Sequence, residues 1–227
     1  MWMTRNRPFA MIALVALGSC TDTVTPPVQL ESGTRTTQFA NGQLWSRIEL
    51  QDGVGHGVWE TWFADGSPKS KDSFRTGILD GPSGAWFAGG QPRFTGAYLE
   101  GLPNGPWTRW HPSGNKLSEG EYRQGVRFGP WTNWYLDGTL QIQAVYTGDG
   151  GNGHFANYYE DGKPKSDGNI VDGVRVGPWR EWWPGGELRK IANFIDGKLH
   201  GACEFYSVAG VLDKARSGNY LDGKLQP

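Results

Sequence analysis

Residues 101–122 read GLPNGPWTRWHPSGNKLSEGEY, and this stretch decides the fold. Its two central glycines, Gly105 and Gly114, each recur every 24 residues along the chain. A fixed period of this length is typical of a repeat architecture. The two glycine columns are Gly57, Gly81, Gly105, Gly129, Gly153, Gly177 and Gly201, and Gly66, Gly90, Gly114, Gly138, Gly162, Gly186 and Gly210.

A third glycine column stands four residues before the first, and with it the three columns hold 20 of the 35 glycines in the 227 residues. Glycine disfavours long helices, because it costs about 1 kcal/mol per helical site relative to alanine. Collagen is excluded since the glycines do not recur at every third residue. Aromatic residues make up 13% of the chain, which argues against disorder. The third column is Gly53, Gly77, Gly101, Gly125, Asp149, Gly173 and Gly197.

Aromatic residues keep the same register. Two residues after the first glycine column, the chain has Trp59, Ser83, Trp107, Trp131, Phe155, Trp179 and Cys203. Five residues after it stand Trp62, Trp86, Trp110, Trp134, Tyr158, Trp182 and Tyr206. Seventeen residues after it stand Phe74, Tyr98, Tyr122, Tyr146, Ile170 and Phe194.

Each 24-residue unit therefore predicts two short strands and two turns. Asp65-Gly66 and its equivalents predict a hairpin with a type I′ turn, which needs positive φ; glycine turns such as Asp52-Gly53 lead to the next unit. We predict an all-β fold, an elongated twisted antiparallel meander of tandem β-hairpins without a sandwich core. The array is expected over residues 39–227, as about seven full units with partial ends.

The two tryptophan columns are three residues apart. In a flat strand an odd spacing puts them on opposite faces. Either both faces carry aromatic rings, or a bulge turns one of the columns around. The sequence leaves both arrangements open.

The unit Gly-x-x-x-Gly-Pro-Trp-x-x-Trp-x-x-x-Gly, followed by Tyr-x-x-Gly, resembles the MORN repeat, and more closely its bacterial variant form. Ser83, Cys203 and Asp149 depart from the pattern. The resemblance implies a ribbon of β-hairpins and roles in protein scaffolding, dimerisation or membrane-lipid contact. Many bacterial proteins with the variant repeat are named as antitoxins of the YwqK type, which implies neutralisation of a toxin.

The N-terminus carries two arginines, Arg5 and Arg7, followed by an apolar stretch from Pro8 to Leu17. This pattern is typical of a secretory signal peptide and is too short for a membrane span. Leu17-Gly18-Ser19-Cys20 resembles a bacterial lipobox, which implies lipidation of Cys20 after removal of residues 1–19. We expect a lipoprotein at the outer membrane, facing the periplasm or the surface, with a flexible tether over residues 20–38. A conventional signal peptide is the alternative.

No residue pattern indicates catalysis. The four histidines, His56, His111, His154 and His200, share no column in neighbouring units, so we expect no metal site and no triad. Gly148–Gly153 lacks the lysine of a P-loop and the spaced acids of an EF-hand. We expect no enzyme activity and no cofactor. The net charge of −1 argues against nucleic-acid binding.

The tryptophans are the candidate binding residues, since exposed aromatic stripes mark binding sites and interfaces favour tryptophan. Alternatively, the tryptophans pack against one another within the sheet. We expect a protein–protein interaction scaffold with an unidentified protein partner, which in the antitoxin alternative is a toxin. Binding of glycan or peptidoglycan on an aromatic platform is a further alternative. The candidate face is Trp59, Trp62, Trp86, Trp107, Trp110, Trp131, Trp134, Trp179 and Trp182.

Overall fold

The computed structural model describes residues 31–227, which form strands and turns only. Within these residues no helix is long and apolar enough to cross a membrane. The strands of the first half are β1 (Gly33–Gln38), β2 (Leu44–Gln51), β3 (Val54–Trp62), β4 (Pro68–Arg75), β5 (Ile78–Trp86), β6 (Pro92–Leu99), β7 (Leu102–Pro103), β8 (Gly105–Trp110) and β9 (Lys116–Arg123). Those of the second half are β10 (Val126–Trp134), β11 (Leu140–Tyr146), β12 (Gly153–Tyr158), β13 (Pro164–Val171), β14 (Val174–Trp182), β15 (Leu188–Ile195), β16 (Lys198–Leu199), β17 (Gly201–Phe205), β18 (Gly218–Leu221) and β19 (Lys224–Leu225).

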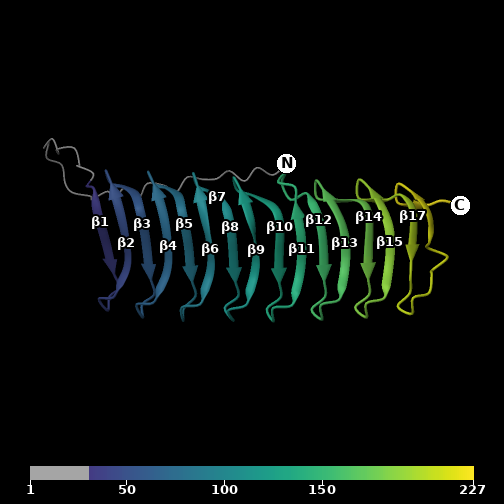
Figure 1. The fold of residues 1–227 in the computed structure, drawn as a ribbon, viewed down its shortest axis with the longest axis horizontal. Coiled ribbons are helices and arrows are strands. Elements are labelled where there is room, and N and C mark those ends of the chain that lie inside the picture. Colours follow the sequence, from purple (N-terminus) through teal and green to yellow (C-terminus); the bar gives the residue numbers. More distant parts are fainter. Residues whose placement is uncertain (1–30) are drawn as a thin grey trace, which may run out of the picture.

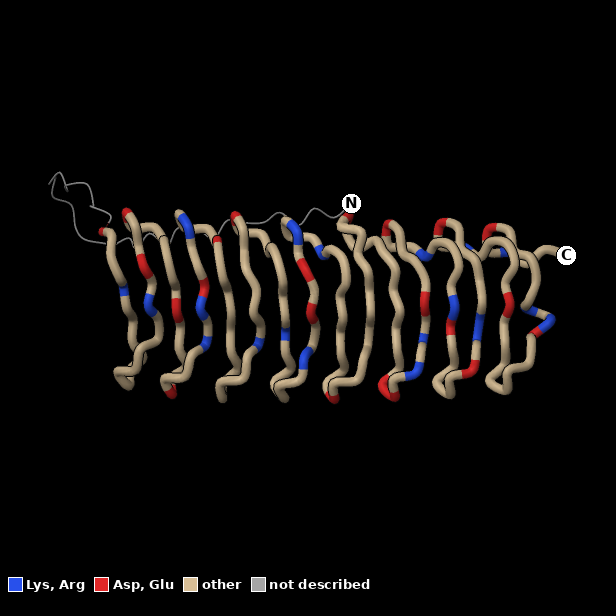
Figure 2. The backbone as a smooth tube through the Cα atoms, viewed as in Figure 1, with Lys and Arg blue, Asp and Glu red and all other residues tan. Residues whose placement is uncertain are grey.

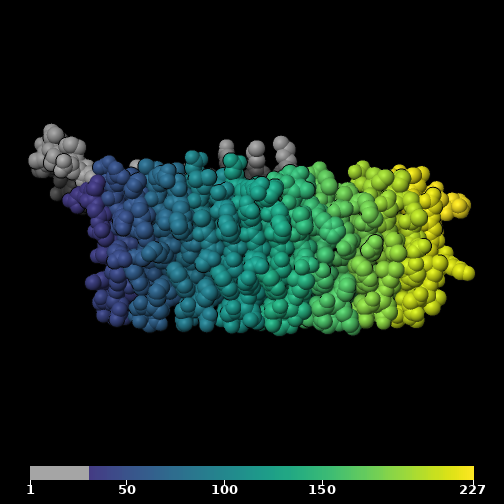
Figure 3. All heavy atoms as spheres, viewed as in Figure 1, coloured from purple at the N-terminus to yellow at the C-terminus, as the bar shows by residue number. Residues whose placement is uncertain are grey.

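The strands form an antiparallel meander, as predicted. Each long strand pairs with the strands before and after it in the chain, and hairpins stand side by side along the ribbon (Figure 1). In the space-filling view the residue numbers rise steadily from one end of the molecule to the other (Figure 3). Each unit therefore contacts only its neighbours, as in other repeat proteins.

The type I′ turns lie at the other end of the hairpins from the predicted position. Asp65 keeps a negative φ, and only Gly66 is positive, at 84°. Phe63 N donates to Ser67 O (2.8 Å) and Gly66 N to Phe63 O (2.9 Å), so Ala64, Asp65 and Gly66 form a three-residue loop, in which only the last residue needs positive φ. Both central residues have positive φ in the turns Asp52–Gly53, Thr76–Gly77, Glu100–Gly101, Gln124–Gly125, Asp172–Gly173, Asp196–Gly197 and Asp222–Gly223.

A register shift beside each three-residue loop resolves the orientation of the tryptophan columns. Thr61 pairs with Ser70 and Trp62 with Pro68, so Lys69 is the extra residue, and it lies on the returning strand β4. Strand β3 keeps its alternation, and Trp59 and Trp62 point to opposite faces. Both faces of the sheet carry aromatic rings. We call them the packed face, with Trp59 and its column, and the stripe face, with Trp62 and its column.

The array begins earlier than the predicted residue 39. Strand β1 pairs with β2 from Gly33 onward and is exposed at every residue. Its sequence GTRTTQ holds no apolar residue, so only backbone pairing and the polar contact Thr37 Oγ1–Ser46 Oγ (2.7 Å) attach it. The predicted signal peptide, lipidated Cys20 and most of the predicted tether lie outside the described residues.

The core contact of the ribbon is an indole ring that lies on a glycine of the preceding strand. Trp131 is 4% exposed and covers Gly120, its pair across β9 and β10; a Cβ built on that glycine would lie 2.2 Å from the ring. Trp131 Nε1 donates to the carbonyl oxygen of Glu121 (3.0 Å), one residue further on. The same arrangement joins Trp107 to Gly96 and Ala97 O, and Trp179 to Gly168 and Asn169 O.

Units without glycine at this position have a different residue in the tryptophan column. Ser83 pairs with Asp72 and donates to its carboxylate (2.5 Å). Phe155 pairs with Ala144. In the last unit the buried Cys203 takes the place of the tryptophan, and Ala192 takes the place of the glycine.

Trp59 is the exception, because it faces Ile48. Its buried Nε1 has no hydrogen-bond partner among the described residues. Glycine is therefore what lets an indole lie flat enough to reach the carbonyl group.

The Phe/Tyr column connects these indoles into a continuous aromatic ladder on the packed face. Its steps are edge-to-face contacts, except that Phe94 stacks on Trp107 at 5.5 Å and 12°. Such pairs contribute about 0.5–1.5 kcal/mol each beyond the buried area. Along the chain the ladder runs through Phe94, Tyr98, Trp107, Tyr122, Trp131, Tyr146 and Phe155.

We predict that Gly120→Ala destabilises the protein by about 1–3 kcal/mol, because the added Cβ overlaps the Trp131 ring. The matched control is Gly84→Ala, whose Cβ would have only ordinary contacts, the shortest being 3.4 Å to Phe94 O. The midpoints of urea denaturation measure both changes. Equal midpoints for the two variants would contradict the packing role of Gly120.

A second prediction transplants the contact into the unit that lacks it. Ser83→Trp alone should destabilise the chain, since the ring meets Asp72. In the double variant Asp72→Gly/Ser83→Trp the ring has a glycine beneath it and the carbonyl of Ser73 within reach. A double-mutant cycle should then show a favourable coupling above about 1 kcal/mol. Additive effects of the two substitutions would contradict the pairing.

Candidate functional site

The nine candidate tryptophans do not form one face. Trp107, Trp131 and Trp179 are 5%, 4% and 2% exposed on the packed face, and their indole N–H groups are bonded within the sheet. Trp59 shares that face and is partly buried. The remaining candidates lie on the stripe face, so the structure brings together Trp62, Trp86, Trp110, Trp134 and Trp182.

The stripe face carries an unbroken row of partly exposed aromatic rings near the three-residue loops. Tyr158 continues the row in the fifth unit and Tyr206 in the seventh. Across from each ring the returning strand places the residue with which it pairs. These pairs are Trp62–Pro68, Trp86–Pro92, Trp110–Lys116, Trp134–Leu140, Tyr158–Pro164 and Trp182–Leu188.

Several charged side chains on the stripe face are paired locally. Glu60 takes contacts from Arg47 and from Lys71 (3.1 Å), and Arg47 lies 5.7 Å from the centre of the Trp62 ring. Lys116 bonds Glu119 (2.5 Å) and lies 5.6 Å from the Trp134 ring. Figure 2 shows both signs of charge scattered along the whole ribbon. The aromatic row is therefore flanked by a nearly neutral polar surface.

Sequence reasoning missed a further column, six residues after the first glycine column, which ties neighbouring units together. Tyr135 donates from its hydroxyl to Tyr158 O (2.9 Å), and Tyr159 likewise to Trp182 O (2.8 Å). Trp183 Nε1 donates to Tyr206 O (3.2 Å). The 24-residue spacing was the available signal: the column reads Phe63, Phe87, His111, Tyr135, Tyr159 and Trp183. These bonds hold the backbone of the stripe residues in the next unit.

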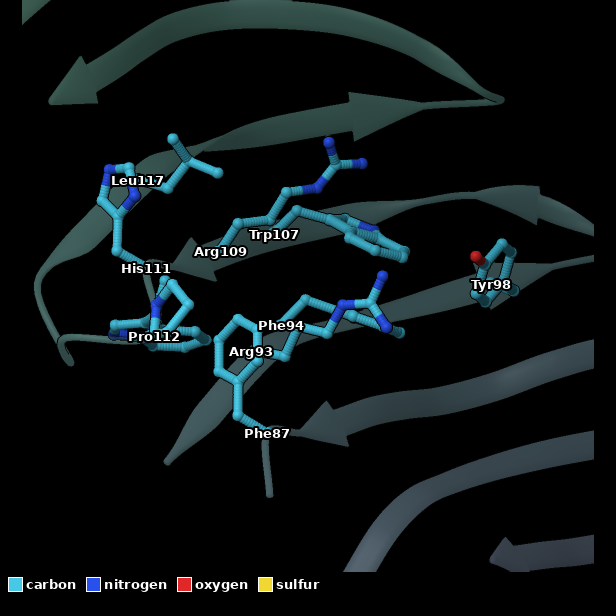
Figure 4. Close-up of a pocket in the computed structure, with 10 residues that line it drawn as sticks. Phe87, Arg93, Phe94, Tyr98, Trp107, Arg109, His111, Pro112 and Leu117 are labelled. Atoms are coloured by element: carbon cyan, nitrogen blue, oxygen red, sulfur yellow. The ribbon is translucent and has the colours of Figure 1, made fainter. Parts of the chain in front are cut away.

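The packed face has a hollow of about 520 Å³ between Phe87 and Trp107 (Figure 4). Arg93 and Arg109 line it, and His111 lies at its loop end. Tyr98 lies at the other end, where burial, followed by the negative charge of Asp72, raises the pKa of its hydroxyl. That hydroxyl is therefore a neutral group at physiological pH.

The sixth unit holds a partly buried carboxylate among cations on the packed face. Glu181 contacts Arg175 (2.5 Å) and Lys190 (2.9 Å), and Arg175 also lies 4.3 Å from the Trp179 ring. Burial raises the pKa of Glu181, but the hydrogen bonds from Lys190 and Arg175 outweigh it and hold the pKa below its usual value. This cluster stabilises the ionised form, and a small hollow of about 80 Å³ lies beside it.

We predict that Glu181→Gln lowers stability at pH 7 by roughly 1.5–3 kcal/mol, the range for a hydrogen bond to a charged group. Since the folded pKa lies below the unfolded value, near 4.3, the contribution is complete above that value and is lost as the pH falls through the folded pKa. Denaturation of both proteins between pH 7 and pH 3 should show the difference narrowing at the acid end. The control is Glu160→Gln, an exposed loop glutamate; a pH-independent gap would contradict the assignment.

The histidines and the cysteine lie apart from one another. His154 is 3.4 Å from Asp167, and His200 is 4.0 Å from Asp222. Over residues 31–227, no three His, Cys, Asp or Glu side chains gather in a way that would hold a metal ion. Cys203 is 2% exposed and packs in the C-terminal apolar cluster with Trp179 and Phe205.

The family model of the MORN repeat variant matches residues 103–124 and 175–196, two stretches that lie three 24-residue units apart. No curated protein matches the chain. Among 44 matching chains of solved structures is one described as "Crystal Structure of TcdB2-TccC3-Cdc42". It is 13% identical over 82% of this chain, which spans 12% of that chain's length, with a TM-score of 0.21. At that TM-score the likeness supports no inference about function.

Proposed function

We propose that the chain is a non-catalytic scaffold that binds another protein through its stripe face. The unbroken row of partly exposed aromatic rings carries this proposal. Units of two strands place successive rings roughly 9–10 Å apart, which is a spacing of two strand widths. The packed face uses its own tryptophans to hold the sheet together, whereas the stripe indoles leave part of their surface to solvent.

Three further features support this function. MORN repeats, which the chain matches at two places, suggest a repeat-based binding scaffold. Interfaces favour tryptophan, and continuous exposed apolar surface marks binding sites. The bonds from Tyr135 and Tyr159 hold the stripe backbone in place, so little ordering is needed on binding.

We also propose that Cys20 anchors the scaffold to the outer membrane as a lipidated residue. The sequence Leu17-Gly18-Ser19-Cys20 after a charged start and an apolar stretch supports this location. Two or more acyl chains hold a protein stably at a bilayer. Cys20→Ser should abolish incorporation of a labelled fatty acid and release the protein from the membrane fraction. Undiminished labelling of this variant would contradict lipidation at Cys20.

The partner's identity separates this proposal from its two alternatives. An antitoxin of the YwqK type is a special case of it, with one toxin as partner, and a toxin gene beside this one would favour that case. Glycan or peptidoglycan binding would use the same aromatic row as a stacking platform. Addition of cell-wall fragments should then change the tryptophan fluorescence, whereas a protein-binding scaffold predicts no change.

We predict that Trp110→Ala/Trp134→Ala loses the protein partner that the wild-type chain captures from cross-linked envelope fractions, because it opens a gap in the middle of the stripe. Both side chains are partly exposed, so the fold should survive, which circular dichroism checks. The control is Leu99→Ala, an apolar residue at the far end of the strands that is more exposed than either tryptophan (48%). An unchanged set of captured proteins would contradict the proposal.

A further inference from the structure

The hollow on the packed face lies where the repeat departs from its own pattern. In the register of the sheet, Phe94 lies between Ala85 on one side and Arg109 on the other. In the first and fifth units the equivalent positions bond to each other across the hairpin, Thr61 to Ser70 (2.8 Å) and Asn157 to Ser166 (3.0 Å). The small Ala85 side chain and the unbonded Arg109 leave an opening instead.

The guanidinium groups that line this hollow have no acidic partner. Within residues 31–227, Arg93 and Arg109 make no ion pair and no side-chain hydrogen bond, whereas the arginines at 47, 75, 123, 175 and 189 each contact a carboxylate. Both are exposed, and they extend in the same direction from the neighbouring strands β6 and β8 (Figure 4).

The surrounding sequence leaves the positive charge uncompensated. Residues 81–118 contain three basic side chains, Arg93, Arg109 and Lys116, and one acidic side chain, Glu100, in the type I′ turn. Asp72, on the same face, is engaged by Ser83 (2.5 Å). The hollow therefore attracts an anion, and two planar guanidinium groups suit carboxylates in particular.

The walls of the hollow are apolar. Phe87, Phe94, Trp107, Trp110, Pro112 and Leu117 supply them, and the Trp107 N–H is already bonded to Ala97 O (3.1 Å). Besides the arginines and the indoles, Tyr98 and His111 are the polar side chains among the lining residues. A sugar, with a hydroxyl on almost every carbon, finds few partners there, whereas an apolar side chain beside a carboxylate matches both parts of the site.

We infer that this hollow binds an acidic peptide segment of a partner protein, with carboxylates on Arg93 and Arg109 and an aromatic or aliphatic side chain between Phe87 and Phe94. The site opens on the packed face, although Trp110 of the stripe also lines it. It extends the proposed function to a second binding surface rather than resting on it. A partner that uses both faces would wrap the ribbon.

The probe is the end-capped pentapeptide Glu-Phe-Glu-Leu-Glu, titrated into the full-length protein by calorimetry. Its counterpart with glutamine in place of each glutamate tests the charge, and trigalacturonate tests an anionic sugar. The site variant is Arg93→Gln/Arg109→Gln. The control is Arg180→Gln, which removes an exposed and equally unpaired arginine from the stripe face of the sixth unit.

We expect saturable binding of the acidic pentapeptide to the wild-type protein and to the Arg180→Gln variant. The Kd should rise at least about tenfold for the glutamine peptide and for the double variant, since loss of a charged hydrogen bond is worth that much or more. An equal loss of peptide affinity in the Arg180→Gln variant would show that only the net charge of the protein matters, and this would overturn the site. Binding that ignores Arg93 and Arg109, tighter binding of trigalacturonate, or no peptide binding at all would also overturn it.

Discussion

An indole ring laid on a glycine of the neighbouring strand is the contact on which the rest of the ribbon depends. A single sheet has no second layer to cover its side chains, so each face must bury apolar surface within itself. A tryptophan buries about 150–250 Å² when covered, and at about 25 cal/mol per Å² this contributes roughly 4–6 kcal/mol as an upper bound. Without the glycine the ring stands away from the sheet, and its N–H cannot reach the backbone.

As a result, the two faces of the sheet have different roles. The packed face holds the strands through the ladder from Phe94 to Phe155 and through the C-terminal cluster around Trp179 and Cys203. The stripe face has a row of rings that no other layer covers. A binding surface on one side can thus vary in sequence while the other side maintains the sheet. The bonds across 23 residues, such as Tyr135 to Tyr158, connect the two by fixing the strand ends.

Much of this fold follows from the sequence, since the glycine columns mark most of the turns and the period excludes a globular core. The turn type at Asp65-Gly66 does not follow, because the same dipeptide suits a two-residue turn and the end of a three-residue loop. Strand β1 cannot be predicted from the hydrophobic pattern either, because its sequence GTRTTQ has no apolar residue. The glycines at 96, 120 and 168 were a readable signal for the buried tryptophans, eleven residues ahead of each.

The candidate site was only half predictable. Spacing identified the tryptophans, but a bulge placed at Lys69 rather than on the tryptophan strand decides which face each column occupies. The hollow beside Trp107 arises from exceptions to the repeat at Ala85, Phe94 and Arg109. A repeat pattern describes what the units share, so it does not reveal features that arise where single units differ.

The contacts between successive 24-residue units also bear on how such a chain grows. The glycine under each indole belongs to the unit before it, so each indole–glycine contact crosses a unit boundary. A duplication of 24 residues, cut at any point, therefore recreates a complete interface without new chemistry. Ser83 with Asp72 and Phe155 with Ala144 show the limit of this freedom. In each pair the two residues suit each other and belong to neighbouring units. A duplication that copied only one of them would place an aromatic ring over a carboxylate, or a serine over a glycine.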